Sequence, residues 1–241
     1  MTDRDSITHG GTTINYEIRR SKRRKKTIEV RVSRDGVCVY VPWAVSGSEI
    51  REFVRDRGSW ILSHLARLSE IEPIRFADGE TLAYLGREIP MVFETADVSG
   101  PEVDLEDGVF KVTEPVGAGD EERVEMIGQA FLKWYHYRAG EHLVETVDRW
   151  WPVAGHGPKS LVLIRNQRKR WGSCGVDGTL RFNWRVMMLE PDLIDYVVVH
   201  ELAHLQVRNH SPDFWNLVQS FLPDVPQRRK RLRQKAIGMQ L

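Results

Sequence analysis

Cysteine is scarce in this sequence. Only Cys38 and Cys174 occur among 241 residues, far apart and outside any CxxC pair. Proteins that depend on a disulfide framework carry more cysteines at closer spacing. A disulfide framework is therefore excluded, and we expect both side chains to be thiols in a reducing compartment.

Long apolar runs and a large net charge are also missing. No stretch approaches the roughly 20 apolar residues that a membrane span requires, and the first residues lack the apolar run of a secretory signal. Lysine and arginine total 35 against 34 aspartate and glutamate, which gives a net charge of +1. We therefore expect a cytoplasmic protein with no membrane span and no overall attraction to nucleic acid or acidic lipids.

The N-terminal part alternates apolar and polar residues in the manner of β-strands. Two such stretches, 28–32 and 37–41, flank Asp35-Gly36 and predict an antiparallel hairpin with a tight turn. Ser46 and Glu49 then have the spacing of a capping box. The apolar stripe that follows predicts a helix, which Gly58 could kink.

A turn-rich segment separates the two halves of the chain. Residues 72–113 carry short apolar stretches between turn residues, which predict short strands. Residues 114–121 are rich in glycine and acid, which is typical of a linker. We therefore expect a β-rich domain over 1–113, a linker at 114–121 and a second domain over 122–241.

The second half is mainly helical. Helical periodicity runs over 122–151, where Gly140 could divide it, and strands are predicted at 160–164 and within 176–184. An apolar helix over 191–207, another starting at 211 and a basic one over 227–236 follow. The fold class is therefore α+β, a mostly antiparallel β unit with a helix followed by a unit with a small sheet and further helices.

His200, Glu201 and His204 form an HExxH pattern within the apolar helix. Positions four apart on an α-helix lie about 40° apart and roughly 6 Å along the axis, so both imidazoles can reach one ion. Glu201 projects to the side of the pair, where it can act on a water molecule. An ordinary buried helix with hydrogen-bonded histidines is the alternative, but burying these groups without a metal is costly. The pattern therefore predicts a zinc site with Glu201 as the catalytic carboxylate.

A catalytic zinc usually takes three protein ligands, so a third is needed. We expect it to be His210, because Asn209 tolerates the positive φ that would reverse the chain after the helix. The interval from His204 to His210 equals that of HExxHxxGxxH, but Val207 replaces its glycine, which counts against a metzincin. The alternative ligands are Asp213 and Glu190.

Several segments resemble the YgjP-like family of metal-dependent hydrolases. The resemblance rests on RNQRKRWGSC at 165–174, LRFNW at 180–184, IDYVVVHELAH at 194–204 and NHSPDFW at 209–215. It extends to RRKK at 23–26, VP at 41–42, WI at 60–61 and YLGR at 84–87, so it covers most of the chain.

The resemblance implies a zincin-like metallopeptidase that uses Zn²⁺ and acts on peptides or proteins. The resemblance also implies that His200, His204 and His210 bind the metal and that Glu201 is the catalytic carboxylate. The family is also similar to SprT-like and WLM proteases, which are associated with proteins crosslinked to DNA, but that is an analogy between folds.

The segment 171–174 allows two interpretations. It could form an edge strand or loop that faces substrate, with Cys174 near the metal, or Trp171 could pack in the core with Gly172 at a bulge or turn. We favour packing, because buried aromatic side chains mostly fill cores. Arg170 could stabilise an oxyanion, but for this residue too we favour the interpretation without a role in catalysis.

Two basic clusters, at 19–26 and 228–235, support a rival hypothesis. They could bind phosphates, which would make the chain a nucleic-acid-binding module with a structural metal or none, or a protease acting on DNA-bound proteins. Basic runs are more often solvated faces. The sequence does not indicate an oligomeric state.

Overall fold

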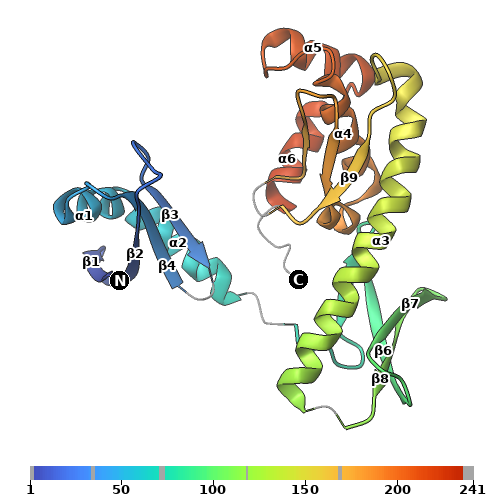
Figure 1. The fold of residues 1–241 in the computed structure, drawn as a ribbon, viewed down its shortest axis with the longest axis horizontal. Helices are drawn as coiled ribbons and strands as arrows, with labels where there is room; N and C mark the ends of the chain where they lie inside the picture. Colours follow the sequence, from blue (N-terminus) through green and yellow to red (C-terminus); the bar gives the residue numbers. More distant parts are fainter. Residues whose placement is uncertain (1–2, 34–35, 71–73, 118, 168–169, 236–241) are drawn as a thin grey trace. The chain divides into compact units, whose positions relative to one another are not determined.

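The computed structural model describes residues 3–33, 36–70, 74–117, 119–167 and 170–235 (Figure 1). The chain divides into two compact units, Met1–Pro73 and Ile74–Leu241. Among the described residues, no helix combines the length and apolarity needed to cross a bilayer.

The N-terminal unit is built on one four-stranded sheet. Its strands are β1 (Asp3–His9), β2 (Thr12–Ser21), β3 (Glu29–Ser33) and β4 (Gly36–Pro42), in the order β1-β2-β4-β3. Both hairpins are antiparallel, whereas the central pair β2·β4 is parallel. The strands predicted around Asp35-Gly36 therefore pair as expected, although Asp35 itself lies outside the described residues.

Two helices cover one face of this sheet. The helix α1 (Gly47–Asp56) begins at the predicted capping box of Ser46 and Glu49, and α2 (Gly58–Glu70) follows at once. Their apolar side chains pack on the alternate residues of β2 and β4 that point inward. Gly58 is required where the chain turns from α1 to α2, because a Cβ there would lie 2.3 Å from His9 Cγ. The residues that alternate with these point to the opposite face of the sheet, which is more polar.

The second unit begins with a sheet of the same strand order. Its strands are β5 (Thr81–Tyr84), β6 (Arg87–Ala96), β7 (Glu102–Glu106) and β8 (Val109–Pro115), in the order β5-β6-β8-β7. Two-residue turns with positive φ, Leu85-Gly86 and Asp107-Gly108, join the hairpins. Side chains of this sheet pack on α3 (Asp120–Ala154), where Phe110 meets the rings of Phe131 and Trp134 edge on.

This packing gives a domain division that differs from the expected 1–113, 114–121 and 122–241. The sheet β5–β8 shares one hydrophobic core with α3 and the helices that follow, so the compact units meet after residue 73. Residues 114–121, of which 118 lies outside the described residues, connect β8 to α3 within one unit. Turn-rich composition marks a loop, but only the packing across it decides where a domain ends.

The remaining elements form the part that carries the histidines. The strands β9 (Val162–Arg165), β10 (Gly172–Cys174) and β11 (Leu180–Asn183) form a sheet of order β10-β11-β9, so β10 is an edge strand. A 3-10 turn, η1 (Trp184–Met188), leads to α4 (Pro191–Ala203), α5 (Pro212–Phe221) and α6 (Val225–Lys235). The α+β prediction is confirmed, and α3 is one continuous helix that Gly140 does not divide.

Candidate metal centre

The helix α4 presents the HExxH residues. Pro191 stands in its first turn, and most of its side chains are buried, as the apolar sequence predicts. His200 and His204 lie one turn apart near its C-terminal end, with ring centroids 5.0 Å apart. The spacing of four residues therefore brings both imidazoles to one side of the helix.

A hydrogen bond fixes the orientation of the His204 ring. His204 stands at the end of α4, where its Nδ1 lies 3.0 Å from the carbonyl oxygen of Val207. A carbonyl oxygen can only accept, so Nδ1 carries the proton and donates. The other nitrogen, Nε2, is left as a lone-pair donor suited to a metal.

His210 returns to the same place after the helix. Its Nε2 lies 3.0 Å from His200 Nε2, and Asn209 Oδ1 accepts a hydrogen bond from the Ser211 backbone N–H at 3.2 Å. The expectation of positive φ at Asn209 is wrong, because Phe76, Leu85 and Asp107 are the non-glycine residues with positive φ in the described chain. The helix ends earlier than predicted, at Ala203, so the chain reverses over more residues and needs no left-handed one.

The three imidazoles fit a single divalent cation. One nitrogen from each of His200, His204 and His210 lies within 4.8 Å of the others, and no other such group of three occurs in the described part of the chain. Two nitrogens on one tetrahedral zinc, each at about 2.0 Å, lie roughly 3.3 Å apart, close to the 3.0 Å between His200 and His210. The alternatives Asp213 and Glu190 are not part of this group.

The neutral state of the buried histidines favours metal binding at this group. Burial, followed by the neighbouring His204 and His210, lowers the pKa of His200 to about 3. Burial also lowers the pKa of His204. At neutral pH both rings are therefore neutral, so no proton competes with a cation for their lone pairs.

Glu201 packs against the edge strand β10. Its side chain is buried, and the backbone N–H of Cys174 donates to its carboxylate. A Cβ on Gly172 would lie 2.8 Å from Glu201 Cγ and Oε1, so only glycine allows the strand to come this close. Burial raises the pKa of Glu201 to about 8, against the opposing charge of Arg170 and the Cys174 hydrogen bond.

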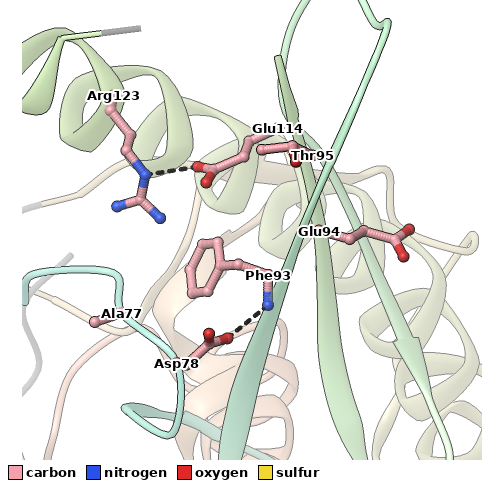
Figure 2. Close-up of a pocket in the computed structure, with 7 residues that line it drawn as sticks. All are labelled: Ala77, Asp78, Phe93, Glu94, Thr95, Glu114 and Arg123. Carbon is pink, nitrogen blue, oxygen red and sulfur yellow. Dashed lines mark hydrogen bonds and ion pairs between the residues drawn. The ribbon is translucent and has the colours of Figure 1, made fainter. Parts of the chain in front are cut away.

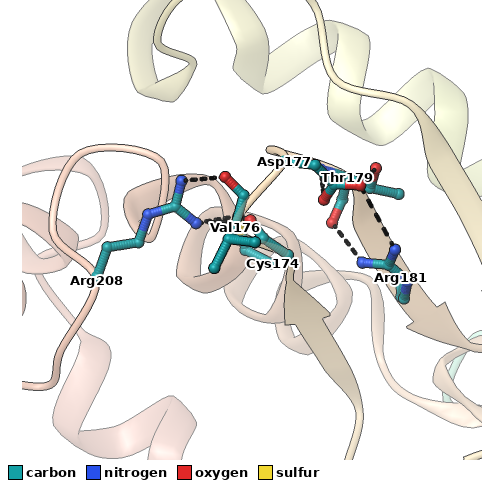
Figure 3. Close-up of polar contacts among 7 residues, drawn as sticks. Cys174, Val176, Asp177, Thr179, Arg181 and Arg208 are labelled. Atoms are coloured by element: carbon teal, nitrogen blue, oxygen red, sulfur yellow. Dashed lines mark hydrogen bonds and ion pairs between the residues drawn. The ribbon is translucent and has the colours of Figure 1, made fainter.

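Arg208 ties the loop that carries His210 to the turn after β10 (Figure 3). Its guanidinium donates to the backbone oxygens of Gly175 at 2.6 Å and Val176 at 3.3 Å. It also lies 3.7 Å from Cys174 Sγ. The segment between His204 and His210 is therefore fastened to the strand that contacts Glu201.

Aromatic side chains of α5 enclose the imidazoles. Phe214 stacks on His204 with ring centroids 4.4 Å apart, and Trp215 stacks on His210 at 5.5 Å. The Arg229 guanidinium of α6 covers the Trp215 ring at 4.1 Å. The sequence argument assigned no site role to Arg208 or Trp215, although both lie within five residues of His210. Their closeness to His210 in the sequence was the one indication that they could belong to the site.

Both interpretations of segment 171–174 hold in part. The segment includes an edge strand, as one alternative required, while Trp171 is half-buried against the core, as the other required. Cys174 is not in the group of metal-binding side chains. Arg170 is exposed, and its charge acts on Glu201.

A hollow of about 610 Å³ lies elsewhere on the second unit (Figure 2). It is bounded by β6, β8 and the start of α3, and the Arg123–Glu114 ion pair of 2.7 Å crosses its rim. None of its lining residues belongs to the histidine group. This hollow is therefore separate from the histidine group.

Comparison with known proteins identifies the family. The model of the YgjP-like metallopeptidase domain matches residues 26–235. The chain belongs to the YgjP-like metallopeptidase family. No curated protein matched significantly.

Two solved structures are similar to part of this YgjP-like chain. One is the metallopeptidase zymogen of Pyrococcus abyssi abylysin, at 24% identity and a TM-score of 0.36, covering 39% of this chain and 93% of that one. The other is the metallopeptidase zymogen of Methanocaldococcus jannaschii jannalysin, at 20% identity and a TM-score of 0.36, covering 39% and 95%. Family membership makes the YgjP-like chain a metal-dependent hydrolase whose substrates are peptides or proteins.

Proposed function

We propose that this chain is a zinc metallopeptidase in which His200, His204 and His210 hold Zn²⁺ and Glu201 is the catalytic carboxylate. The observation that carries the proposal is the convergence of three imidazoles beside a buried carboxylate on one helix and its return loop. A set of three nitrogen donors suits zinc and leaves a position for water.

The alternative of a structural zinc site would require a fourth protein ligand. The group in the described residues contains three histidines and no cysteine or carboxylate. This composition supports a catalytic site over a structural one.

Glu201 is placed to move protons. Zinc, when bound, supplies Lewis acidity toward water and a peptide carbonyl, and a positive charge that favours the ionised form of Glu201. The carboxylate accepts a proton from the attacking water and passes it to the leaving amine as the peptide bond breaks. Burial raises the pKa of Glu201 and strengthens it as a base, while the charge of the cation acts in the opposite direction and keeps it ionised.

Among the described residues β10 is an edge strand, and besides the Cys174 N–H that donates to Glu201 its outer side offers a place for the substrate backbone. β10 pairs with β11 on one side only, and Gly172 brings it against Glu201. An extended peptide that adds to this edge by backbone hydrogen bonds would pass beside the carboxylate. Such binding depends little on side chains, which suits a peptidase acting on more than one sequence.

The test combines elemental analysis with a peptidase assay. We expect about one zinc per chain in purified protein and cleavage of casein or a peptide library that stops with a chelator and returns with Zn²⁺. Protein that contains no transition metal and binds none, or cleavage that a chelator leaves unchanged, would contradict the proposal.

A further inference from the structure

The open face of the N-terminal sheet, with the adjoining loop residues 22–26 and Trp43, carries a concentration of cations and aromatic rings that peptide cleavage does not use. We propose that this basic face, made of residues 22–26 with Arg19, Arg31, Tyr40 and Trp43, binds single-stranded nucleic acid. The inference concerns the first compact unit alone and does not depend on the metal centre.

The strand register builds the face. Arg19 of β2 and Glu29 of β3 both lie beside Tyr40 of β4, on the side of the sheet opposite α1 and α2. The guanidinium of Arg31 lies 4.3 Å from the Tyr40 ring centroid, and those of Arg24 and Arg19 lie at 5.6 and 5.9 Å. Three cations thus gather around one ring on an open sheet surface.

The charge of this region is strongly positive. Residues 19–31 hold eight lysines and arginines and one acid, Glu29. Arg24 and Arg31 pair with Glu29 at 2.6 and 3.1 Å, and Arg19 pairs with Glu17 at 3.5 Å. In the described chain no carboxylate pairs with Lys22, Arg23, Lys25 or Lys26, and all four are exposed. Adjacent cations repel one another, and a chain of phosphates relieves that repulsion.

Trp43 offers a surface on which a base can stack. Its side chain is 62% exposed, and Lys22 Nζ lies 5.7 Å from its ring centroid. Arg20 holds the backbone around it by donating to the carbonyl oxygens of Trp43 at 3.1 Å and Val45 at 2.7 Å. An exposed indole on a held backbone, beside cations, is the combination that single-strand binding sites use.

The basic cluster of α6 differs because most of its charges are already engaged. Arg228 pairs with Asp224 at 2.8 Å, Arg231 with Asp192 at 2.5 Å and Lys235 with Glu190 at 3.0 Å. Arg229 covers Trp215. These contacts hold α6 in place within its own unit, so the two basic clusters predicted from sequence have different roles.

Unpaired bases distinguish the proposed ligand from other polyanions. Lysine and arginine would hold the phosphates of any nucleic acid, but only a single strand presents bases that can stack on Trp43. An acidic peptide or a duplex would satisfy the charge and leave the indole unused.

The test measures fluorescence anisotropy of labelled 20-nucleotide DNA and RNA strands of mixed sequence with the full chain. We expect binding at 50 mM salt that weakens with salt, with a log–log slope of about −3 if four cations neutralise phosphates. The DNA and RNA arms show whether the sugar matters. No binding of either strand at 50 mM salt would overturn the proposal.

Variants separate the contributions of charge and stacking. Lys25→Glu/Lys26→Glu should weaken binding at least ten-fold and flatten the salt slope. Trp43→Ala should weaken it roughly ten-fold with an unchanged slope, since stacking a base is worth about 1–3 kcal/mol. Lys230→Glu/Arg233→Glu on α6 changes the net charge by the same amount and should leave binding unchanged.

Two results would contradict the assignment to single strands. One is equal affinity for duplex DNA, heparin and the single strands, which would indicate a general polyanion surface. The other is unchanged binding by Trp43→Ala, which would remove base stacking. All the substituted side chains are exposed, so we expect every variant to fold. Circular dichroism of each variant checks this.

Discussion

At the scale of single residues, replacing Glu201 with glutamine tests whether its carboxylate must accept a proton. Glutamine has nearly the same shape but cannot accept a proton, so Glu201→Gln should retain the metal and lose about 10²–10⁴-fold in kcat. Elemental analysis and a peptidase assay on the same sample measure both. Wild-type kcat in this variant would remove Glu201 from the mechanism.

His204 should matter for the metal itself. Because its Nδ1 is engaged by Val207, its Nε2 is the donor that His204→Ala removes. We expect this variant to lose bound zinc in elemental analysis after dialysis against buffer. His156→Ala is the matched control, since His156 is exposed and outside the histidine group. Full zinc retention by His204→Ala would contradict its assignment as a ligand.

At the scale of elements, the close approach of β10 to α4 depends on one missing side chain. In Gly172→Ala the new Cβ would meet Glu201, so the strand or the carboxylate must shift. A displacement near 1 Å costs up to about 100-fold in rate, so we expect kcat/KM to fall by about 10–100-fold with zinc content unchanged.

Gly47→Ala is the matched control for that substitution, because no atom lies within 4 Å of the position of its Cβ. It should keep full activity. Normal kcat/KM in Gly172→Ala would mean that the strand does not constrain Glu201.

The ion pairs between α6 and the start of α4 should make stability depend on pH. Burial opposes the charge of Asp192, but the hydrogen bond and charge of Arg231 outweigh it and lower the pKa of Asp192. A lowered folded-state pKa adds stability above the unfolded value of about 3.9, and this stability is lost as pH falls through the folded value.

Arg231→Gln should therefore lower the free energy of unfolding at pH 7 by about 1 kcal/mol or less, because both side chains are partly exposed. The difference from wild type should shrink below about pH 4 as Asp192 loses its charge. Urea unfolding at pH 7 and pH 3 measures it, with Lys230→Gln as the control. A difference that grew toward pH 3 would contradict this account.

Elements formed by local spacing were predictable, whereas their partners were not. The HExxH turn follows from helical geometry, and the turns at Asp107-Gly108 and the capping box follow from backbone preferences. The parallel pairing of β2 with β4 and the early end of α4 depend on contacts between distant residues. No periodic pattern in the sequence contains that information. The positive φ expected at Asn209 followed from placing the end of the helix too late in the sequence.

At the scale of the whole molecule, the position of the domain boundary can be tested by truncation. The β5–β8 sheet covers Phe131, Trp134 and Tyr135 of α3, so residues 74–241 should fold alone, unfold cooperatively and bind zinc. Residues 122–241 should aggregate, because those rings would face water. Soluble, zinc-binding 122–241 would restore the boundary expected from composition.

The attachment of Arg208 has a consequence for ligand binding. Arg208 holds the end of β10, and His210 stands two residues further along the same loop. Metal affinity and peptide affinity should therefore be thermodynamically coupled, and reciprocity requires each ligand to raise the affinity for the other by the same factor. A non-cleavable peptide would then slow the loss of zinc to a chelator, and Arg208→Gln would uncouple the two.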